Sequence, residues 1–179
     1  MAKTRSQNQV TSRIFMILSF IVGLVLLLVG VLSLWAFTFT SNMVKTELSA
    51  QKIYFPEKGS SALDPAVYPD LQKYAGQLVD TPEEAKAYAN SYIGRHLSKI
   101  AGGKVYAEVS AEAMKDPKNT KLQDQKQQLF QGETLRGILL TSGYGFGTVG
   151  KVAGVVAWVA FVSGGLLLAL AIIFKAKTS

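Results

Sequence analysis

Two long stretches without an ionisable side chain dominate the hydrophobic pattern of the chain. They run from Ile14 to Phe39 and from Val152 to Phe174. An α-helix rises about 1.5 Å per residue, so either stretch can cross the hydrocarbon core of a bilayer, which is about 30 Å thick. The pattern therefore predicts two transmembrane helices, over residues 14–39 and 151–174.

The charges that flank these stretches predict their orientation. All 12 acidic residues lie between the two stretches, whereas the tails at 1–13 and 175–179 carry only basic ionisable side chains. Basic flanks stay on the cytoplasmic side of a membrane. We therefore expect a plasma-membrane protein with both termini in the cytoplasm and residues 40–150 outside. The net charge of +7 then follows from topology, and no nucleic-acid partner is expected.

The segment between the two stretches shows the three- and four-residue spacing of helices. Thr81, Pro82 and Glu84 form a capping-box signal for a helix start, and Gly102-Gly103 signals its end. The apolar stripe of this predicted helix consists of Ala85, Tyr88, Ala89, Tyr92, Ile93, His96, Leu97 and Ile100. A stripe of this kind must pack against another element.

Weaker signals predict the remaining elements. Helices are expected over 106–114 and 121–140, with a further short helix inside 63–80 and an irregular connector over 41–61. No segment sustains an alternation of apolar and polar residues, which argues against β-strands. The predicted fold class is therefore all-α, with two transmembrane helices and a helical extracytoplasmic domain inserted between them.

Small residues recur on one face of each apolar stretch. They are Gly23 and Gly30 in the first stretch, and Ala153, Ala157, Ala160 and Gly164 in the second. In a bilayer, such faces let helices approach each other closely. The spacing fits pairing of the two helices within one chain, which is the primary expectation, and it also fits pairing with another protein.

The segment Thr141–Gly145 has the form Thr-x-Gly-Tyr-Gly, which resembles the selectivity filter of potassium channels. Four such loops could line a pore with carbonyl oxygens. Ser142 stands where the filter has valine, and no aspartate follows Gly145. An oligomeric cation channel is therefore the alternative hypothesis. The main expectation is that these glycines loosen or kink the junction between an external helix and the second span.

A candidate partner or junction surface lies near the end of the predicted external helix. It consists of Phe130, Glu133, Arg136, Tyr144 and Phe146. Glu133 and Arg136 are three residues apart on a helix and can form an ion pair. The glutamine-rich segment 123–131, which surrounds Leu129 and Phe130, is a further candidate for contact with a partner.

Few residues in the chain could carry catalysis. The chain has no cysteine, and its one histidine, His96, falls on the predicted apolar stripe, where a lone histidine is more often a packed residue than a base. We find neither the two histidines and carboxylate of an iron site nor a serine nucleophile with an evident oxyanion turn. No catalytic, metal-binding or cofactor-binding residues are expected.

Two segments carry a resemblance to a known family. His96-Leu97 through Gly102–Ser110, followed by Gln131–Gly137, resemble small two-pass membrane proteins of high-GC Gram-positive bacteria. The resemblance implies the same two-span topology and a bacterial plasma membrane. Similar proteins are sometimes labelled aromatic ring-opening dioxygenases, whose non-haem iron sites use two histidines, whereas this chain has one.

These observations predict a non-enzymatic integral membrane protein that acts as an accessory, scaffold or interaction subunit in the bacterial cell envelope. Its expected partners are the lipid bilayer and another membrane or envelope protein, or a second copy of itself. A cation channel is the alternative, and a metal-dependent dioxygenase is the third hypothesis.

Overall fold

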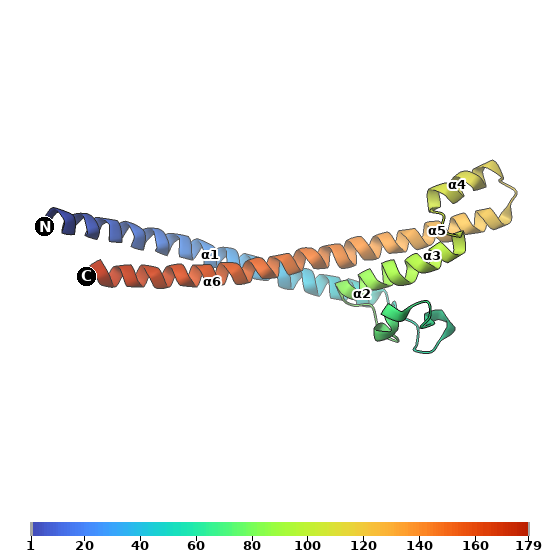
Figure 1. Ribbon diagram of the computed structural model, residues 1–179, viewed down its shortest axis with the longest axis horizontal. Helices are drawn as coiled ribbons and strands as arrows, with labels where there is room; N and C mark the ends of the chain where they lie inside the picture. Colours follow the sequence, from blue (N-terminus) through green and yellow to red (C-terminus); the bar gives the residue numbers. More distant parts are fainter. Residues whose placement is uncertain (1, 179) are drawn as a thin grey trace. The chain divides into compact units, whose positions relative to one another are not determined.

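The computed structural model describes residues 2–178, with the side chains of residue 7 and residues 9–176. In chain order, its elements are α1 (Ala2–Ala50), η1 (Ser61–Leu63), η2 (Pro69–Tyr74), α2 (Pro82–Ala87), η3 (Tyr88–Ile93), α3 (Gly94–Ala101), α4 (Tyr106–Lys115), α5 (Thr120–Ile138), η4 (Leu139–Gly145) and α6 (Phe146–Thr178) (Figure 1). Within residues 2–178 there is no strand, and the only β-type pairing there is an isolated bridge between Tyr54 and Leu78. The prediction of an all-α fold is confirmed.

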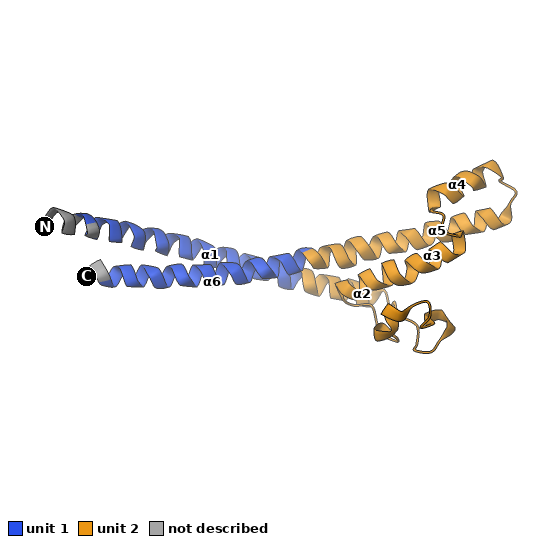
Figure 2. Cartoon of the chain, in the orientation of Figure 1, with its two compact units in different colours: residues 1–39, 149–179 blue, residues 40–148 orange. Residues whose placement is uncertain are grey.

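The chain divides into two compact units (Figure 2). The paired-helix unit comprises residues 1–39 and 149–179, and the helical unit comprises residues 40–148. The first unit holds the two apolar stretches, and the second holds the short helices between them. Each unit is described below by itself.

Apolar side chains cover the outside of the paired-helix unit. Leu32 of α1 is 67% exposed, and Trp158 and Ile172 of α6 are 73% and 70% exposed. Only 17% of the most apolar window of the first helix, and 22% of that of the second, is buried. Both helices are therefore long and apolar enough to cross a membrane, as predicted, and neither is buried as the core helix of a soluble protein would be.

Small residues lie where the two helices of this unit approach each other. Of those predicted to pack helices, Ala153 is half-buried and the buried ones are Gly23, Gly30, Ala157, Ala160 and Gly164. A Cβ atom built on Gly164 would lie 3.0 Å from the carbonyl oxygen of Gly23, and one built on Gly30 would lie 2.9 Å from the ring of Phe161. The two helices of a single chain thus contact each other through these glycines.

The predicted helix start and end of the segment 82–101 are both confirmed. Glu84 N donates to Thr81 Oγ1 at 3.3 Å, and Thr81 N donates to the Glu84 carboxylate at 3.0 Å, which together form the capping box. Gly102 takes a left-handed backbone conformation with φ of 59° and ends α3. Because this conformation is costly for other residues, glycine suits the position.

A π-helical turn, η3, interrupts the middle of this helix. The buried residues of the segment are spaced strictly four apart: Ala85, Ala89, Ile93, Leu97 and Ala101. In an uninterrupted α-helix with 3.6 residues per turn, the first and last of these would point roughly 160° apart. A π turn contains more residues than an α turn, so η3 takes up this drift and keeps the buried row on one side.

Of the two predictions for the segment 41–80, the one for the connector is wrong in part. Residues 41–50 were expected in an irregular connector, but they continue α1, because Val44 and Leu48 are 2% and 6% exposed and pack into the core one turn apart. The single short helix expected within 63–80 is present as η2, which is a 3₁₀ helix, and η1 ends at Leu63, where that segment begins. Pro69 is the first residue of η2, a position that suits proline because no helical N–H is needed there.

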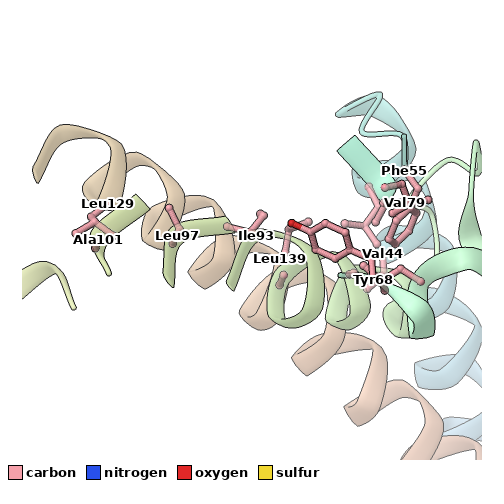
Figure 3. Close-up of a cluster of buried hydrophobic side chains, with 14 of the residues drawn as sticks. Val44, Phe55, Tyr68, Val79, Ile93, Leu97, Ala101, Leu129 and Leu139 are labelled. Carbon is pink, nitrogen blue, oxygen red and sulfur yellow. The ribbon is translucent and has the colours of Figure 1, made fainter. Parts of the chain in front are cut away.

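The core of the helical unit lies along the contact between the segments 82–101 and 120–145 and includes side chains from the last turns of α1, from the segment 53–79 and from α4. Its largest fully buried side chains are Phe55, Leu63, Leu71, Val79, Val109, Leu129 and Leu139. In Figure 3, Leu97 and Ala101 of α3 lie beside Leu129 of α5 at one end of the cluster, and Phe55 and Val79 lie at the other. The core therefore fixes α3 against α5, which positions the surface described next.

Candidate interaction surface

Three glycines set a close approach between the segment 82–101 and the segment 120–148. A Cβ atom built on Gly132 would lie 2.5 Å from Leu97, and one built on Gly143 would lie 2.8 Å from the Cβ of Ala85. A Cβ atom on Gly147 would overlap the ring of Pro82. Of the two glycines in Thr141–Gly145 that were predicted to loosen or kink this junction, Gly143 also lies in the tight contact, and both belong to a π-helical turn, η4, that departs from regular α-helix.

Beside this contact, α5 lines two hollows that share Leu135. The first, of about 420 Å³, is lined by Tyr92, Ile93, His96, Leu97, Ile100, Gln128, Gln131, Gly132 and Leu135. The second, of about 140 Å³, is lined by Val44, Glu47, Leu48, Gln51, Ile53, Leu135, Ile138, Leu139 and Ser142. Together, we refer to these residues as the α5 groove.

The lining of the α5 groove is mostly apolar, with neutral amides. His96 and Glu47 are its only ionisable groups apart from the phenol of Tyr92. Along α5 and η4, the lining extends from Gln128 to Ser142 in steps of three and four residues, a length of roughly 21 Å at the α-helical rise. Ile138 is 54% exposed and Leu135 is 37% exposed, so part of this apolar surface is open.

The candidate surface residues predicted from the sequence contact different neighbours. Phe130 is 53% exposed and contacts the ring of Tyr106 at a centroid distance of 5.9 Å. The hydroxyl group of Tyr144 accepts a hydrogen bond from Lys86. The side chain of Phe146 is 50% exposed. None of these aromatic residues lines the α5 groove.

Glu133 and Arg136 form the predicted ion pair, and Arg136 also reaches the π turn. Arg136 Nη1 donates to both carboxylate oxygens of Glu133 at 2.9 Å. Its Nε donates to the carbonyl oxygen of Ala89 at 3.0 Å, and Nη2 donates to Asn90 Oδ1 at 3.2 Å. The side chain is 26% exposed, so these bonds are partly shielded from water. Arg136 therefore joins α5 to η3 rather than presenting a free charge to a partner.

Two exposed polar contacts shift the pKa of a titratable group in the helical unit. Arg95 Nη1 donates to Asp70 Oδ1 at 2.6 Å, which holds the pKa of Asp70 below its ordinary value. Lys86 Nζ donates to Tyr144 Oη at 3.2 Å, and this ammonium lowers the pKa of the phenol. Both contacts join segments that are distant in the sequence, so they help to hold η2 and η4 against the segment 82–101.

The glutamine-rich segment divides into structural and exposed members. Gln123 Nε2 donates to the carbonyl oxygen of Ala113 at 2.8 Å, and Gln125 Nε2 donates to that of Ile100 at 2.9 Å. These carbonyls lie in the last turns of α4 and α3, where no intrahelical partner is available. Gln128 and Gln131 instead line the α5 groove. Only these two are positioned to contact a partner there.

His96 does not belong to the buried row, which corrects its predicted packed position. Its side chain is exposed and lines the first hollow, because the buried row passes through its neighbour Leu97. The described residues contain no group of three or more His, Asp or Glu side chains that could hold a metal ion. The expectation of a protein without catalytic residues stays a prediction.

The segment Thr141–Gly145 is helical, so the filter-like loop of the channel hypothesis is not formed. It lies within the π turn η4, whose backbone continues directly into α6. A filter needs carbonyl oxygens that point into a pore, whereas helical carbonyls are directed along the helix axis toward intrahelical donors. One of the two glycines of the motif, Gly143, packs against Ala85, and this close contact explains why a residue without a side chain occupies the position.

The α5 groove was not among the site residues predicted from the sequence, although a signal for it exists. Gln128, Gln131, Leu135, Ile138 and Ser142 recur at helical spacing on a face of α5 distinct from that of buried Leu129. Leu135 and Ile138 are the apolar members of this face, and exposed apolar residues on a second face of an amphipathic helix indicate a second packing face.

Comparisons of the chain with protein-family models, with curated proteins and with solved structures find no match. The resemblance to two-pass membrane proteins of high-GC Gram-positive bacteria therefore stays a prediction.

Proposed function

We propose that the protein is a non-enzymatic membrane-anchored interaction subunit of the bacterial cell envelope. In this proposal, α1 and α6 cross the plasma membrane, both termini are cytoplasmic, and the helical unit lies outside. The helical unit binds an apolar helical segment of another envelope protein in the α5 groove. The single observation that carries the proposal is this open groove, which is lined mostly by apolar side chains and neutral amides.

The membrane part of the proposal is supported by the outer surface of the paired-helix unit. Large apolar side chains such as Leu32, Trp158 and Ile172 are mostly exposed, and water is an unfavourable surrounding for so continuous an apolar surface. The hydrocarbon core of a bilayer is a favourable surrounding for these side chains. The backbone N–H and C=O groups are paired by hydrogen bonds within each helix. The basic tails favour the cytoplasmic side for both ends.

The chemistry of the groove indicates what kind of partner it takes. A groove along one helix, flanked by α3 and the last turns of α1, suits an amphipathic helix that inserts its apolar face. A length of roughly 21 Å corresponds to about four helical turns of such a partner. Because Glu47 is the only carboxylate and His96 the only imidazole in the lining, the inserted face should carry few charges of its own.

Site-specific photo-crosslinking in the native cells tests this function. A photoreactive residue at Ile138 should give a discrete adduct with another envelope protein, because this side chain lines the groove and is 54% exposed. Phe130 is a matched control, since it lies on the same helix, is 53% exposed and does not line the groove. An adduct at Ile138 that is absent at Phe130 supports the proposal. No adduct at Ile138, or the same adduct at both positions, contradicts it.

A further inference from the structure

The π turn η3 determines which residues of α3 face α5. Gly94 N donates to the carbonyl oxygen of Ala89, five residues earlier, which is the hydrogen bond of a π turn. Compared with a regular α-helix, such a turn holds one additional residue, so it rotates the residues after it by about 100° around the helix axis. With this turn in place, Leu97 and Ala101 are buried beside α5 (Figure 3), and His96 lines the first hollow of the α5 groove.

The same segment also fits an uninterrupted α-helix, which would bury a different row of residues. At 100° per residue, five residues of such a helix would point within roughly 80° of one another: Ala85, Ala89, Tyr92, His96 and Ile100. All five belong to the apolar stripe predicted from the sequence, so both arrangements give an amphipathic helix. The segment 94–101 therefore has two possible registers against α5, and they differ by one residue.

The two registers give the first hollow a different chemistry. In the observed register, three residues from successive turns contribute to its lining: Tyr92, His96 and Ile100. In the shifted register, these side chains would turn into the contact with α5. The residues that would take their places along the hollow are each one position earlier in the chain: Ser91, Arg95 and Lys99. Two positive charges would then line a surface that is otherwise apolar, which opposes the insertion of an apolar partner.

Arg136 of α5 contacts the π turn at an atom that distinguishes the two registers. Its Nε donates at 3.0 Å to the carbonyl oxygen of Ala89, which also accepts the π-turn bond from Gly94. Its Nη2 donates at 3.2 Å to Oδ1 of Asn90, which lies inside the turn. In a regular α-helix, this carbonyl would accept from the amide four residues later. Because the Arg136 side chain is only 26% exposed, these bonds are partly shielded from water and favour the π turn.

The other contacts that differ between the registers are weaker or offset each other. The shift would break the ion pair of Arg95 with Asp70, but these side chains are 41% and 46% exposed, and such a pair contributes little to stability. The shift would also replace Leu97 by a histidine in the core, whereas Ile100 would replace the smaller Ala101. The bonds of Arg136 are therefore the main contacts that select the observed register.

We propose that Arg136 is the positioning residue of the α5 groove. It holds η3 as a π turn and thereby keeps α3 in the register that leaves the first hollow apolar. The role of the groove in binding rests on the proposed function, whereas the choice of register needs no partner. Loss of the Arg136 side chain shifts the segment 94–101 by one residue and closes the groove to an apolar helix.

The single histidine of the chain reports the register of the full chain in detergent. His96 is exposed in the observed register and would face α5 in the shifted one. We expect Arg136→Ala to slow the modification of His96 by diethyl pyrocarbonate about threefold, which corresponds to about two thirds of the molecules in the shifted register. Lys121→Ala is the matched control, because it removes an exposed positive charge from the same helix, and it should leave the rate unchanged.

A one-residue deletion separates positioning from a general structural role. Deleting Asn90 removes the additional residue of the π turn, so that a regular α-helix buries Ile93, Leu97 and Ala101 again. In this background, His96 should react as fast as in the parent, and Arg136→Ala should have no further effect. Equal rates in the parent and Arg136→Ala overturn the inference. The same decrease with and without Asn90, or a loss of helical circular dichroism in Arg136→Ala that the deletion does not restore, also overturns it.

Photo-crosslinking from Ile138 separates this inference from the proposed function. A parent without an adduct whose His96 rates follow the prediction contradicts the proposed function and supports the register. A parent that forms the adduct, with no change of the His96 rate in Arg136→Ala, overturns the role of Arg136 alone. If Arg136→Ala slows the reaction of His96 but forms the adduct as the parent does, the register does not control the groove, which also overturns the inference.

Discussion

Replacing Gly147 with alanine should destabilise the helical unit by about 1 to 3 kcal/mol, the usual cost of forcing an extra carbon into a packed contact. The added Cβ would overlap the ring of Pro82, and its distance from the Pro82 Cβ would be 2.6 Å. The proline ring is rigid and sits in the first turn of α2, directly after the Thr81 cap, so it cannot turn aside as a longer side chain could. We expect the thermal unfolding midpoint of the full chain in detergent, followed by circular dichroism, to fall by roughly 5 to 15 °C.

Gly137→Ala is the control for this substitution, and its predicted effect has the opposite sign. Gly137 lies in α5, is exposed, and has no atom within 4 Å of a built Cβ. Alanine is favoured over glycine in a helix interior by about 0.5 to 1 kcal/mol, so this variant should unfold at a higher temperature. Similar effects of the two substitutions would contradict the close approach of α6 to Pro82.

Replacing Gly164 with leucine should separate the two helices of the paired-helix unit. A Cβ at this position would lie 3.0 Å from the backbone oxygen of Gly23 and 3.2 Å from the side chain of Leu27, so a larger side chain forces the helices apart. The chain lacks cysteine, and Phe15→Cys with Phe174→Cys would therefore report proximity through a single disulfide. We expect Gly164→Leu to reduce the rate of this cross-link about tenfold, which corresponds to a cost of about 1.4 kcal/mol.

The neighbouring glycine provides the matched control for this experiment. Gly165 lies one residue further along α6, is exposed, and has no atom within 4 Å of a built Cβ. Gly165→Leu makes the same chemical change on another face of the helix and should leave the cross-linking rate unchanged. If both variants cross-link as fast as the parent, the helices of one chain do not pair through Gly164.

One helix of the chain carries both the tight contact and the proposed binding surface. Gly132 lies against Leu97, and both residues also line the α5 groove. The depth of the first hollow therefore depends on how closely α3 approaches α5. The distance between α3 and α5 is set by a glycine, Gly132. A sequence analysis that looks for aromatic or charged groups therefore does not find the α5 groove.

The elements that depend on local chemistry could be predicted from the sequence. The cap formed by Thr81 and Glu84 and the left-handed Gly102 act within a few residues, so their effect is readable without knowledge of the fold. The two apolar helices could also be predicted from the sequence, because an uncharged apolar stretch of this length is long enough to span a bilayer.

The features that depend on tertiary contacts could not be predicted in this way. Residues 41–50 have few helical end signals, and their helix is extended by the packing of Val44 and Leu48. The exposed position of His96 follows from the π turn η3, which changes the residues that face the core after Tyr88. The low helix propensity of glycine predicts a loosened helix at Gly143, but it does not predict the close packing of Gly143 on Ala85 or of Gly147 on Pro82, which depends on residues distant in the sequence.

The most direct test of the proposed arrangement is single-cysteine labelling of cells with a membrane-impermeant maleimide. Gln7→Cys and Ala176→Cys place the thiol in exposed positions near the two termini, and Gln127→Cys places it on an exposed face of α5. Because the natural chain contains no cysteine, each variant reports one position only. We predict that Gln127→Cys is labelled in intact cells and that the two terminal variants are labelled only after permeabilisation. Labelled termini with a protected Gln127→Cys, or all three thiols on one side, would contradict a helical unit held outside the cytoplasm by two spans.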